Sequence, residues 1–432
     1  MKRFLVICAT LLIPAAAAWS LDQADADHLL LRTGFGAPIS SEQMLFPLSK
    51  AAAVDELLSS VRSTPVTSLP VWANRPPLLP PRQTKGENPN AIIAARLHYN
   101  AELNAQDKQL QAWTIREILS TDSPLTEKMV LFWQNHFTSS FMKVRSPLLL
   151  LRQDLLIRKY AFGNYREFLH AIAKDPAMII YLDNETNRKG NANENFAREV
   201  MELFTLGVGH YTEADVKAAA RAFTGWRVNP GSGKFFFDAR QHDNGQKTFL
   251  GKTGNWNGDD IINIILQQKQ ASLFIVEQMW RQFISPTPDL KTVELLASRF
   301  RESNYDIKSL LRDILTSDEF WAAQNRGNLV KSPIDLLAGT IRTLDISGFN
   351  TDKNDERVAA VSAELGEPLF NPLSVKGWPY DTGWIHSNTL LRRDEVVGYL
   401  FREFVRVNGS QLSWAARKAL RSSVMSLSYE LE

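Results

Sequence analysis

NANENFAREVMELFTLGVGHYTEADVKAAARAFTGW, residues 191–226, predicts two α-helices joined by a short glycine-containing turn. In its first half, Phe196, Val200 and Phe204 recur at i, i+4 and i+8, which places three large apolar side chains on one helix face. Gly207 follows this stripe, and glycine readily adopts the left-handed conformation that ends a helix. We therefore expect a helical hairpin at the centre of the fold.

The starts of these two helices are predicted from residue spacing. Asn191 with Glu194, and Thr212 with Asp215, have the spacing of a capping box, in which each side chain accepts a hydrogen bond from the other residue's backbone N–H. The second helix is rich in alanine, at Ala218, Ala219, Ala220 and Ala222. Because alanine has little bulk, we expect the two helices to pack closely.

Apolar residues recur at helical spacing along most of the remaining chain, which predicts an all-α, mostly α-helical fold in a single domain at 19–432. Two segments depart from this pattern. Residues 63–90 contain seven prolines and predict an extended arm lying over the body, with an unstructured linker as the alternative. Residues 234–250 place Asn244-Gly245 between phenylalanine-rich segments and predict a small β-hairpin insertion.

Residues 1–18 have the features of a secretory signal peptide. Lys2 and Arg3 form a basic start, an apolar run follows at 4–13, and small residues precede a predicted cleavage after Ala18. An uncleaved N-terminal anchor is the alternative, but the run is shorter than the roughly 20 residues that a spanning helix needs. We expect a periplasmic or secreted protein whose mature chain has no transmembrane segment.

The mature chain is predicted to be electrically balanced, because residues 19–432 contain 47 basic and 47 acidic side chains. No net positive charge therefore favours nucleic acid as a partner. The only cysteine, Cys8, lies in the predicted signal peptide. The mature chain thus has neither disulfides nor thiol chemistry.

Ionisable side chains are concentrated on the predicted helical hairpin and on the loop that follows it. Glu199 and Glu202 are three residues apart and project from one helix face. Imidazole and carboxylate groups suit zinc, iron or manganese, so a divalent metal ion is the predicted cofactor. The predicted metal ligands are His136, His210, His242 and Asp243, and the predicted catalytic residues are Glu199, Glu202, Arg198 and Arg221. The alternative is a set of helix-surface ion pairs and structural histidines, since no H-E-x-x-H motif is present.

A second group of candidates is aromatic. The predicted substrate-binding residues are Trp226, Trp256, Trp378, Trp384 and Lys247, and Tyr380 lies in the same kind of loop. Tryptophan faces in loops rich in glycine, proline or asparagine offer contact area to sugars or peptides. The alternative is that these tryptophans hold long loops onto the body.

Other chemistries lack their motifs in this sequence. It contains no G-x-S-x-G nucleophile elbow and no G-x-x-x-x-G-K-[ST] phosphate loop. It also contains no C-x-x-C-H, which excludes covalently attached haem.

Several blocks together resemble the family catalogued as domain of unknown function 1800. They are HLLLRTGFGAP, LFWQNHF, DPAMIIYLDN, the stretch from 193 to 226, HDNGQKTFLGKTG, KSPIDLL and VKGWPYDTGW. The resemblance implies bacterial secretion, a helical architecture and a co-secreted partner from the family catalogued as domain of unknown function 1501, which resembles sulfatases. It implies no assigned activity. The family commonly has His-Asn-His where this chain has Gln134-Asn135-His136.

These observations lead to two functional hypotheses. The first is a metal-assisted or carboxylate-dependent enzyme that acts on a polysaccharide or another envelope or extracellular polymer. The second is a non-catalytic binding or assembly protein that works with its co-secreted partner. In the second hypothesis the charges are structural and the loop tryptophans form the interface.

Overall fold

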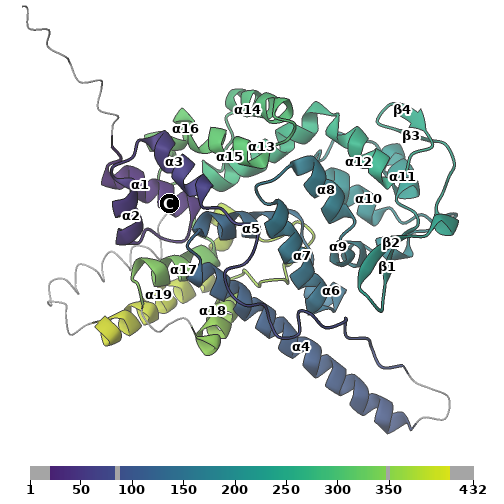
Figure 1. Ribbon diagram of the computed structural model, residues 1–432, viewed down its shortest axis with the longest axis horizontal. Helices are drawn as coiled ribbons and strands as arrows, with labels where there is room; N and C mark the ends of the chain where they lie inside the picture. Colours follow the sequence, from purple (N-terminus) through teal and green to yellow (C-terminus); the bar gives the residue numbers. More distant parts are fainter. Residues whose placement is uncertain (1–19, 83–87, 347–350, 409–432) are drawn as a thin grey trace, which may run out of the picture.

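The computed structural model describes residues 20–82, 88–346 and 351–408, which form nineteen α-helices and four short strands (Figure 1). The mostly α-helical prediction is confirmed. The predicted signal peptide lies outside the described residues.

The helices before the central pair are α1 (Gln23–Thr33), α2 (Ile39–Leu45), α3 (Lys50–Ser59), α4 (Pro89–Ser120), α5 (Pro124–His136), α6 (Phe141–Val144), α7 (Pro147–Tyr160), α8 (Tyr165–Ala173) and α9 (Pro176–Tyr181). The central pair is α10 (Asn195–Glu202) and α11 (Glu213–Ala222). The helices after it are α12 (Gly258–Leu266), α13 (Lys269–Phe283), α14 (Leu290–Glu302), α15 (Ile307–Leu315), α16 (Asp318–Trp321), α17 (Pro333–Thr343), α18 (Asp352–Glu364) and α19 (Ser387–Asn408).

The central helical hairpin is present, and one of its two predicted capping boxes is correct. Thr212 and Asp215 form the reciprocal box at the start of α11. The box predicted at Asn191 was wrong, because α10 starts four residues later with Glu194 as its N-cap and no side-chain cap bond. Asn191 instead forms a short antiparallel bridge with Arg188. The buried alanines of α11 allow the close packing on α10 that the sequence predicts.

The β structure consists of two separate two-stranded sheets. Strand β1 (Trp226–Asn229) pairs with β2 (Lys234–Phe237), and β3 (Lys247–Phe249) pairs with β4 (Lys252–Gly254). A small β element thus lies where it was predicted, but its turns do not fall at Asn244-Gly245. The reason is that β1 and β4, which lie at the edges of the predicted segment or beyond it, supply the partners of β2 and β3.

The proline-rich segment before α4 runs along that helix as far as it is described (Figure 1). The carboxylate of Glu117 accepts the backbone N–H groups of Val66 and Thr67, at 2.8 and 2.6 Å. Trp72 is buried and donates its indole N–H to Gln109. These contacts attach the arm to the C-terminal half of α4. The N-terminal half of α4 projects from the body (Figure 1).

Two hydrophobic cores meet at helix α5. Met129, Phe132 and Trp133 belong to the core formed with α1, α8 and α10 to α15. Leu131, on another face, belongs to the core formed with α4, α17, α18 and α19. Eleven of the thirteen residues of α5 are buried, so this helix has no solvent face.

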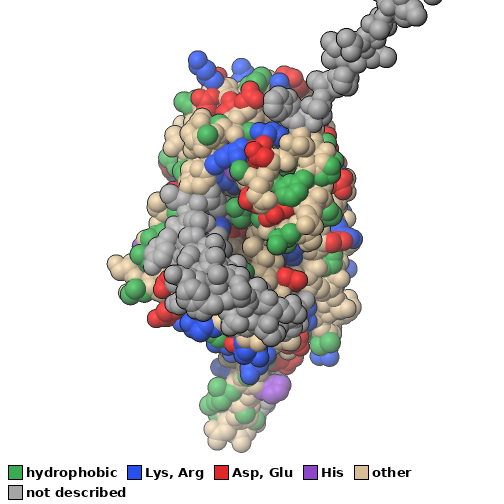
Figure 2. Space-filling view, turned by 90° about the vertical axis from the view of Figure 1, so that its left-hand side faces the viewer, with side chains coloured by type: hydrophobic (Ala, Val, Ile, Leu, Met, Phe, Trp, Pro, Cys, Tyr) green, Lys and Arg blue, Asp and Glu red, His purple; other side chains and the backbone are tan. Residues whose placement is uncertain are grey.

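The surface adds two observations on partners. Figure 2 shows acidic and basic side chains interspersed over the face that it displays, without a field of one sign. Among the described helices, none combines the length and the hydrophobicity needed to cross a membrane.

Candidate functional site

The histidine on α5 is enclosed in the hydrophobic core. His136 is buried, and its Nε2 lies 3.0 Å from the carbonyl oxygen of Phe204, where it donates a hydrogen bond. Burial lowers its pKa to about 4, so the ring is neutral at pH 7. Gln134, two positions earlier, points elsewhere and donates to Asp154 at 2.6 Å. Side chains at i and i+2 of a helix do not face one another, so positions 134 and 136 do not form one ligand pair here.

The other predicted metal ligands are not brought together either. His210 is exposed in the turn after α10, whereas His242 is buried, with Nδ1 2.9 Å from the carbonyl oxygen of Thr224. Asp243 is held by Arg221, which contacts it at 2.7 and 3.2 Å and lowers its pKa to about 2. Among the described residues, no group of three or more His, Cys, Asp or Glu side chains is arranged to hold a metal ion.

The predicted catalytic residues form pairs of their own. Arg198 binds Glu213 through both of its terminal nitrogens, at 2.7 and 2.8 Å. Glu202 accepts the hydroxyl of Tyr211 at 2.8 Å. Burial, together with the nearby charge of Glu202, raises the pKa of Glu199. Arg198 and Arg221 thus form ion pairs, as in the alternative interpretation, whereas Glu202 is bound by a tyrosine hydroxyl.

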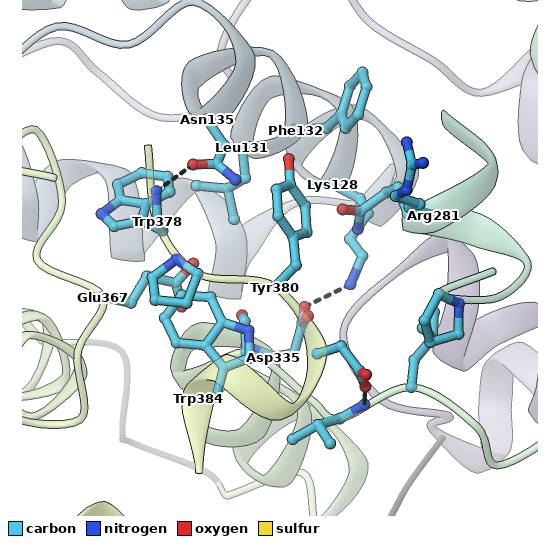
Figure 3. Close-up of a pocket in the computed structure, with 17 residues that line it drawn as sticks. Lys128, Leu131, Phe132, Asn135, Arg281, Asp335, Glu367, Trp378, Tyr380 and Trp384 are labelled. Carbon is cyan, nitrogen blue, oxygen red and sulfur yellow. Dashed lines mark hydrogen bonds and ion pairs between the residues drawn. The ribbon is translucent and has the colours of Figure 1, made fainter. Parts of the chain in front are cut away.

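The predicted substrate-binding residues divide into two groups. Trp226 is buried against Phe223 and Trp256 packs over Gly254, while Lys247 is buried and donates to the carbonyl groups of two neighbouring loop residues. Trp378 and Trp384, by contrast, both line a cavity of about 170 Å³ (Figure 3).

This cavity, which we call the α5 pocket, gathers residues from distant parts of the chain. Its main polar and aromatic lining residues are Lys128, Asn135, Arg281, Asp335, Glu367, Trp378, Tyr380 and Trp384. Three of the blocks that carry the family resemblance converge here: LFWQNHF on α5, KSPIDLL at the start of α17, and VKGWPYDTGW in the loop before α19.

Helix α5 positions the loop that closes the pocket. The backbone N–H of Trp378 donates to Asn135 Oδ1 at 2.5 Å, and the indole N–H of Trp378 donates to the Pro368 carbonyl at 3.0 Å. Gly377 has φ +85°, and a Cβ at this position would lie 2.1 Å from Asn135 Oδ1. The chain must therefore have glycine here to come this close to α5.

The floor of the pocket contains an ion pair beside a protonated carboxyl group. Lys128 Nζ lies 2.6 Å from Asp335 Oδ1, and both side chains are largely buried. Glu367 is fully enclosed and accepts the backbone N–H of Ile334 at 2.8 Å. Burial, and secondarily the charge of Asp335, raises the pKa of Glu367 to about 8. Glu367 thus holds a proton at pH 7 next to a charged pair, which is an arrangement found at catalytic sites.

The mouth of the pocket is open and aromatic. The Tyr380 ring stands between the two tryptophans and the Lys128–Arg281 side (Figure 3). Tyr380 is 39% exposed, but its hydroxyl reaches inward to Asn135, and burial raises the pKa of this phenol to about 12. Arg281 is partly exposed at the rim and pairs with Glu277 at 3.1 Å. The mouth therefore offers a ligand flat aromatic faces and one guanidinium, and Glu367 is buried below them.

The sequence interpretation missed Lys128, Asp335, Glu367 and Arg281. Lys128 and Asp335 are separated by 207 positions, so no local spacing connects them. A usable signal was the charge of Lys128 directly before the apolar run Met129–Trp133, because a buried lysine requires an acidic partner.

Fold and site together define a mostly α-helical protein with an aromatic, carboxyl-containing pocket between two hydrophobic cores. The chain belongs to the family described as protein of unknown function (DUF1800), whose model matches residues 28–429. No curated protein and no solved structure matches the chain. The resemblance noted in the sequence is therefore confirmed, and it brings no activity with it.

The raised pKa of Glu367 predicts a specific pH dependence of stability. A group whose pKa is higher in the folded state stabilises the fold fully below its unfolded pKa, and this contribution is lost as the pH rises through about 8. The free energy of unfolding, measured by urea titration, should therefore fall more between pH 5 and pH 9 for the wild-type protein than for the Glu367→Gln variant. The exposed neighbour variant Glu364→Gln should follow the wild type. If the free energy of unfolding changes with pH in the same way for the wild type and for Glu367→Gln, the raised pKa of Glu367 is contradicted.

The placement of the histidines predicts that His242 and His210 differ in their effect on stability. His242→Ala removes a buried hydrogen bond and a ring packed on Phe237, so we expect a loss of about 1–3 kcal/mol in the free energy of unfolding. His210→Ala should stay within about 0.5 kcal/mol, because that side chain is exposed. Elemental analysis should give the same metal content for both variants and the wild type. Stoichiometric metal that disappears from a folded His242→Ala variant would show that the ligand hypothesis was right.

Proposed function

We propose that this protein is a carboxylate-dependent enzyme that hydrolyses a glycosidic bond of an extracellular or envelope polysaccharide in the α5 pocket. The observation that carries the proposal is a buried carboxyl group with a raised pKa beside a second carboxyl group that is held in an ion pair. Glu367, with a pKa of about 8, is protonated at pH 7, while Asp335 is ion-paired with Lys128. Glycoside hydrolysis uses such a pair, in which one residue gives a proton and the other is ionised.

The two residues have distinct roles in this reaction. Glu367 gives its proton to the leaving-group oxygen as the bond between that oxygen and the anomeric carbon breaks. Asp335 accepts a proton from the water whose oxygen bonds to the anomeric carbon. One water is consumed, and a proton transferred from Asp335 back to Glu367 through solvent restores the starting state. Lys128 holds the Asp335 carboxylate in place through their contact of 2.6 Å.

The walls of the pocket support a sugar as the substrate. Trp378, Trp384 and the Tyr380 ring give it large, rigid apolar faces, while Arg281 adds a hydrogen-bonding group at the rim. Its volume of about 170 Å³ is below the roughly 300–1,000 Å³ usual for ligand pockets. This size suits a single ring, so we expect action at a chain end or a branch rather than in the middle of a polymer.

The metal-assisted version of the enzyme hypothesis has less support. Its predicted ligands are engaged separately, His136 with Phe204, His242 with Thr224 and Asp243 with Arg221. The proposed location outside the cytoplasm depends on the predicted signal peptide at 1–18.

A non-catalytic binding role is the second candidate, and one observation favours it. Glu367 accepts the N–H of Ile334 near the start of α17, and Asp335 lies in the first turn of that helix. Carboxylates at a helix N-terminus are stabilising without any chemistry. In this case the aromatic mouth would bind the polymer, or the co-secreted partner of the domain of unknown function 1501 family, without cleaving it.

The experiment that separates the two candidates is a reducing-end assay over a panel of bacterial and plant polysaccharides. Wild-type protein should release reducing ends from at least one polymer, and Glu367→Gln should be at least about 100-fold slower, the typical contribution of a general acid. Glu364 has an exposed carboxyl group and lies three residues before Glu367 in the sequence. The Glu364→Gln variant should retain full activity, and both variants should remain folded. No release from any polymer, or equal rates for Glu367→Gln and wild type, would contradict the proposal. Saturable binding without release would support the second candidate.

A further inference from the structure

A second cavity, which we call the α18–α19 groove, lies apart from the α5 pocket and shares no lining residue with it. Helices α18 and α19 both pack on α17, at the lower left of Figure 1. The cavity of about 320 Å³ is formed by these three helices. Its apolar lining residues are Leu337, Val358, Val361, Val396 and Leu400.

The apolar faces follow directly from the helix sequences. Val358 and Val361 are three residues apart on α18, and Val396 and Leu400 are four apart on α19, so each pair forms one stripe. These stripes face each other across Leu337 of α17. Valine is short, so the stripes leave between them a space lined mostly by carbon atoms. Water finds few hydrogen-bonding partners in such a space, whereas an apolar ligand fills it favourably.

The mouth of the groove is basic. Arg357, Arg392 and Arg402 line it, and among the described residues Glu395 is the one acidic side chain of the lining. Arg392 is engaged by Glu364 and Glu395, at 2.7 and 3.1 Å. Arg357 donates to the Tyr399 hydroxyl at 3.0 Å and lies 4.4 Å over that ring. Within the part of the chain that the structure describes, neither Arg357 nor Arg402 forms an ion pair with a carboxylate.

We propose that the α18–α19 groove binds a free single-chain fatty acid, with its aliphatic chain along the valine stripes and its carboxylate between Arg357 and Arg402. The lining excludes a polar ligand, and the positive mouth selects an anion over a neutral or cationic amphiphile. The volume is at the lower end of the roughly 300–1,000 Å³ usual for small-ligand pockets, which is too small for a helix of a protein partner.

The direct test is calorimetric titration of the full chain with dodecanoate, below the concentration at which it forms micelles. We expect saturable binding at one site. Dodecanol, with the same chain and no charge, should bind about tenfold more weakly, which is about 1.4 kcal/mol for the charge-assisted contact. The double variant Arg357→Gln/Arg402→Gln should bind dodecanoate as weakly as dodecanol. Arg406→Gln, which removes a charge from the same helix outside the groove, should bind like the wild type.

Two further measurements distinguish the groove from a basic surface. Val361→Trp places an indole in the groove and should abolish binding of both dodecanoate and dodecanol. If this variant does not fold, the double variant Arg357→Gln/Arg402→Gln still tests the proposal, because both of its positions are exposed. Vesicles containing phosphatidylglycerol should not compete with dodecanoate. The proposal is overturned if dodecanoate does not bind, if dodecanol binds equally well, or if anionic vesicles bind while free dodecanoate does not.

Discussion

Helix α5 has no face toward solvent, and its sequence nevertheless carries Glu127, Lys128, Asn135 and His136. A charged or polar group enclosed among apolar side chains costs several kcal/mol unless it finds a partner. Each of these four groups does so on a different segment: Glu127 with Arg158 of α7, Lys128 with Asp335 of α17, Asn135 with the Trp378 loop, and His136 with Phe204 in the turn after α10. Because each of these polar groups needs a partner inside the protein, the buried helix α5 determines how four other segments pack against it.

The α5 pocket is a consequence of that requirement. The Lys128–Asp335 pair fixes the start of α17 beside α5, and the bond from Trp378 to Asn135 fixes the loop on the other side. Between these two attachments lies the cavity, and the side chains of Glu367 and Tyr380 line it. Removing Asp335 would take away the carboxylate that pairs with the buried Lys128 ammonium, so fold stability and site chemistry depend on the same residues.

Local spacing in the sequence correctly predicted the mostly helical fold and one of the two capping boxes. The helical stripes and the Thr212–Asp215 capping box were correct because periodicity and caps act within a few residues. The pairing of β1 with β2 and of β3 with β4 was not predicted. The prediction relied on the Asn244-Gly245 turn signal and left out the neighbouring residues that form β1 and β4. At the site, Trp378 and Trp384 were predicted because loop tryptophans are conspicuous. Lys128, Asp335 and Glu367 were not, because only the tertiary fold brings them together and raises the pKa of Glu367.

The acid–base chemistry of the α5 pocket depends on a Glu367 carboxyl group that is protonated at neutral pH. Infrared difference spectroscopy between the wild type and Glu367→Gln measures this directly, through the C=O stretch of a carboxylic acid. At pH 7 the wild type should show a band that the variant lacks, and the band should disappear with a midpoint near pH 8. Spectra without that difference between pH 6 and 9 would mean that Glu367 is ionised in the fold, and the acid–base account of the pocket would be wrong.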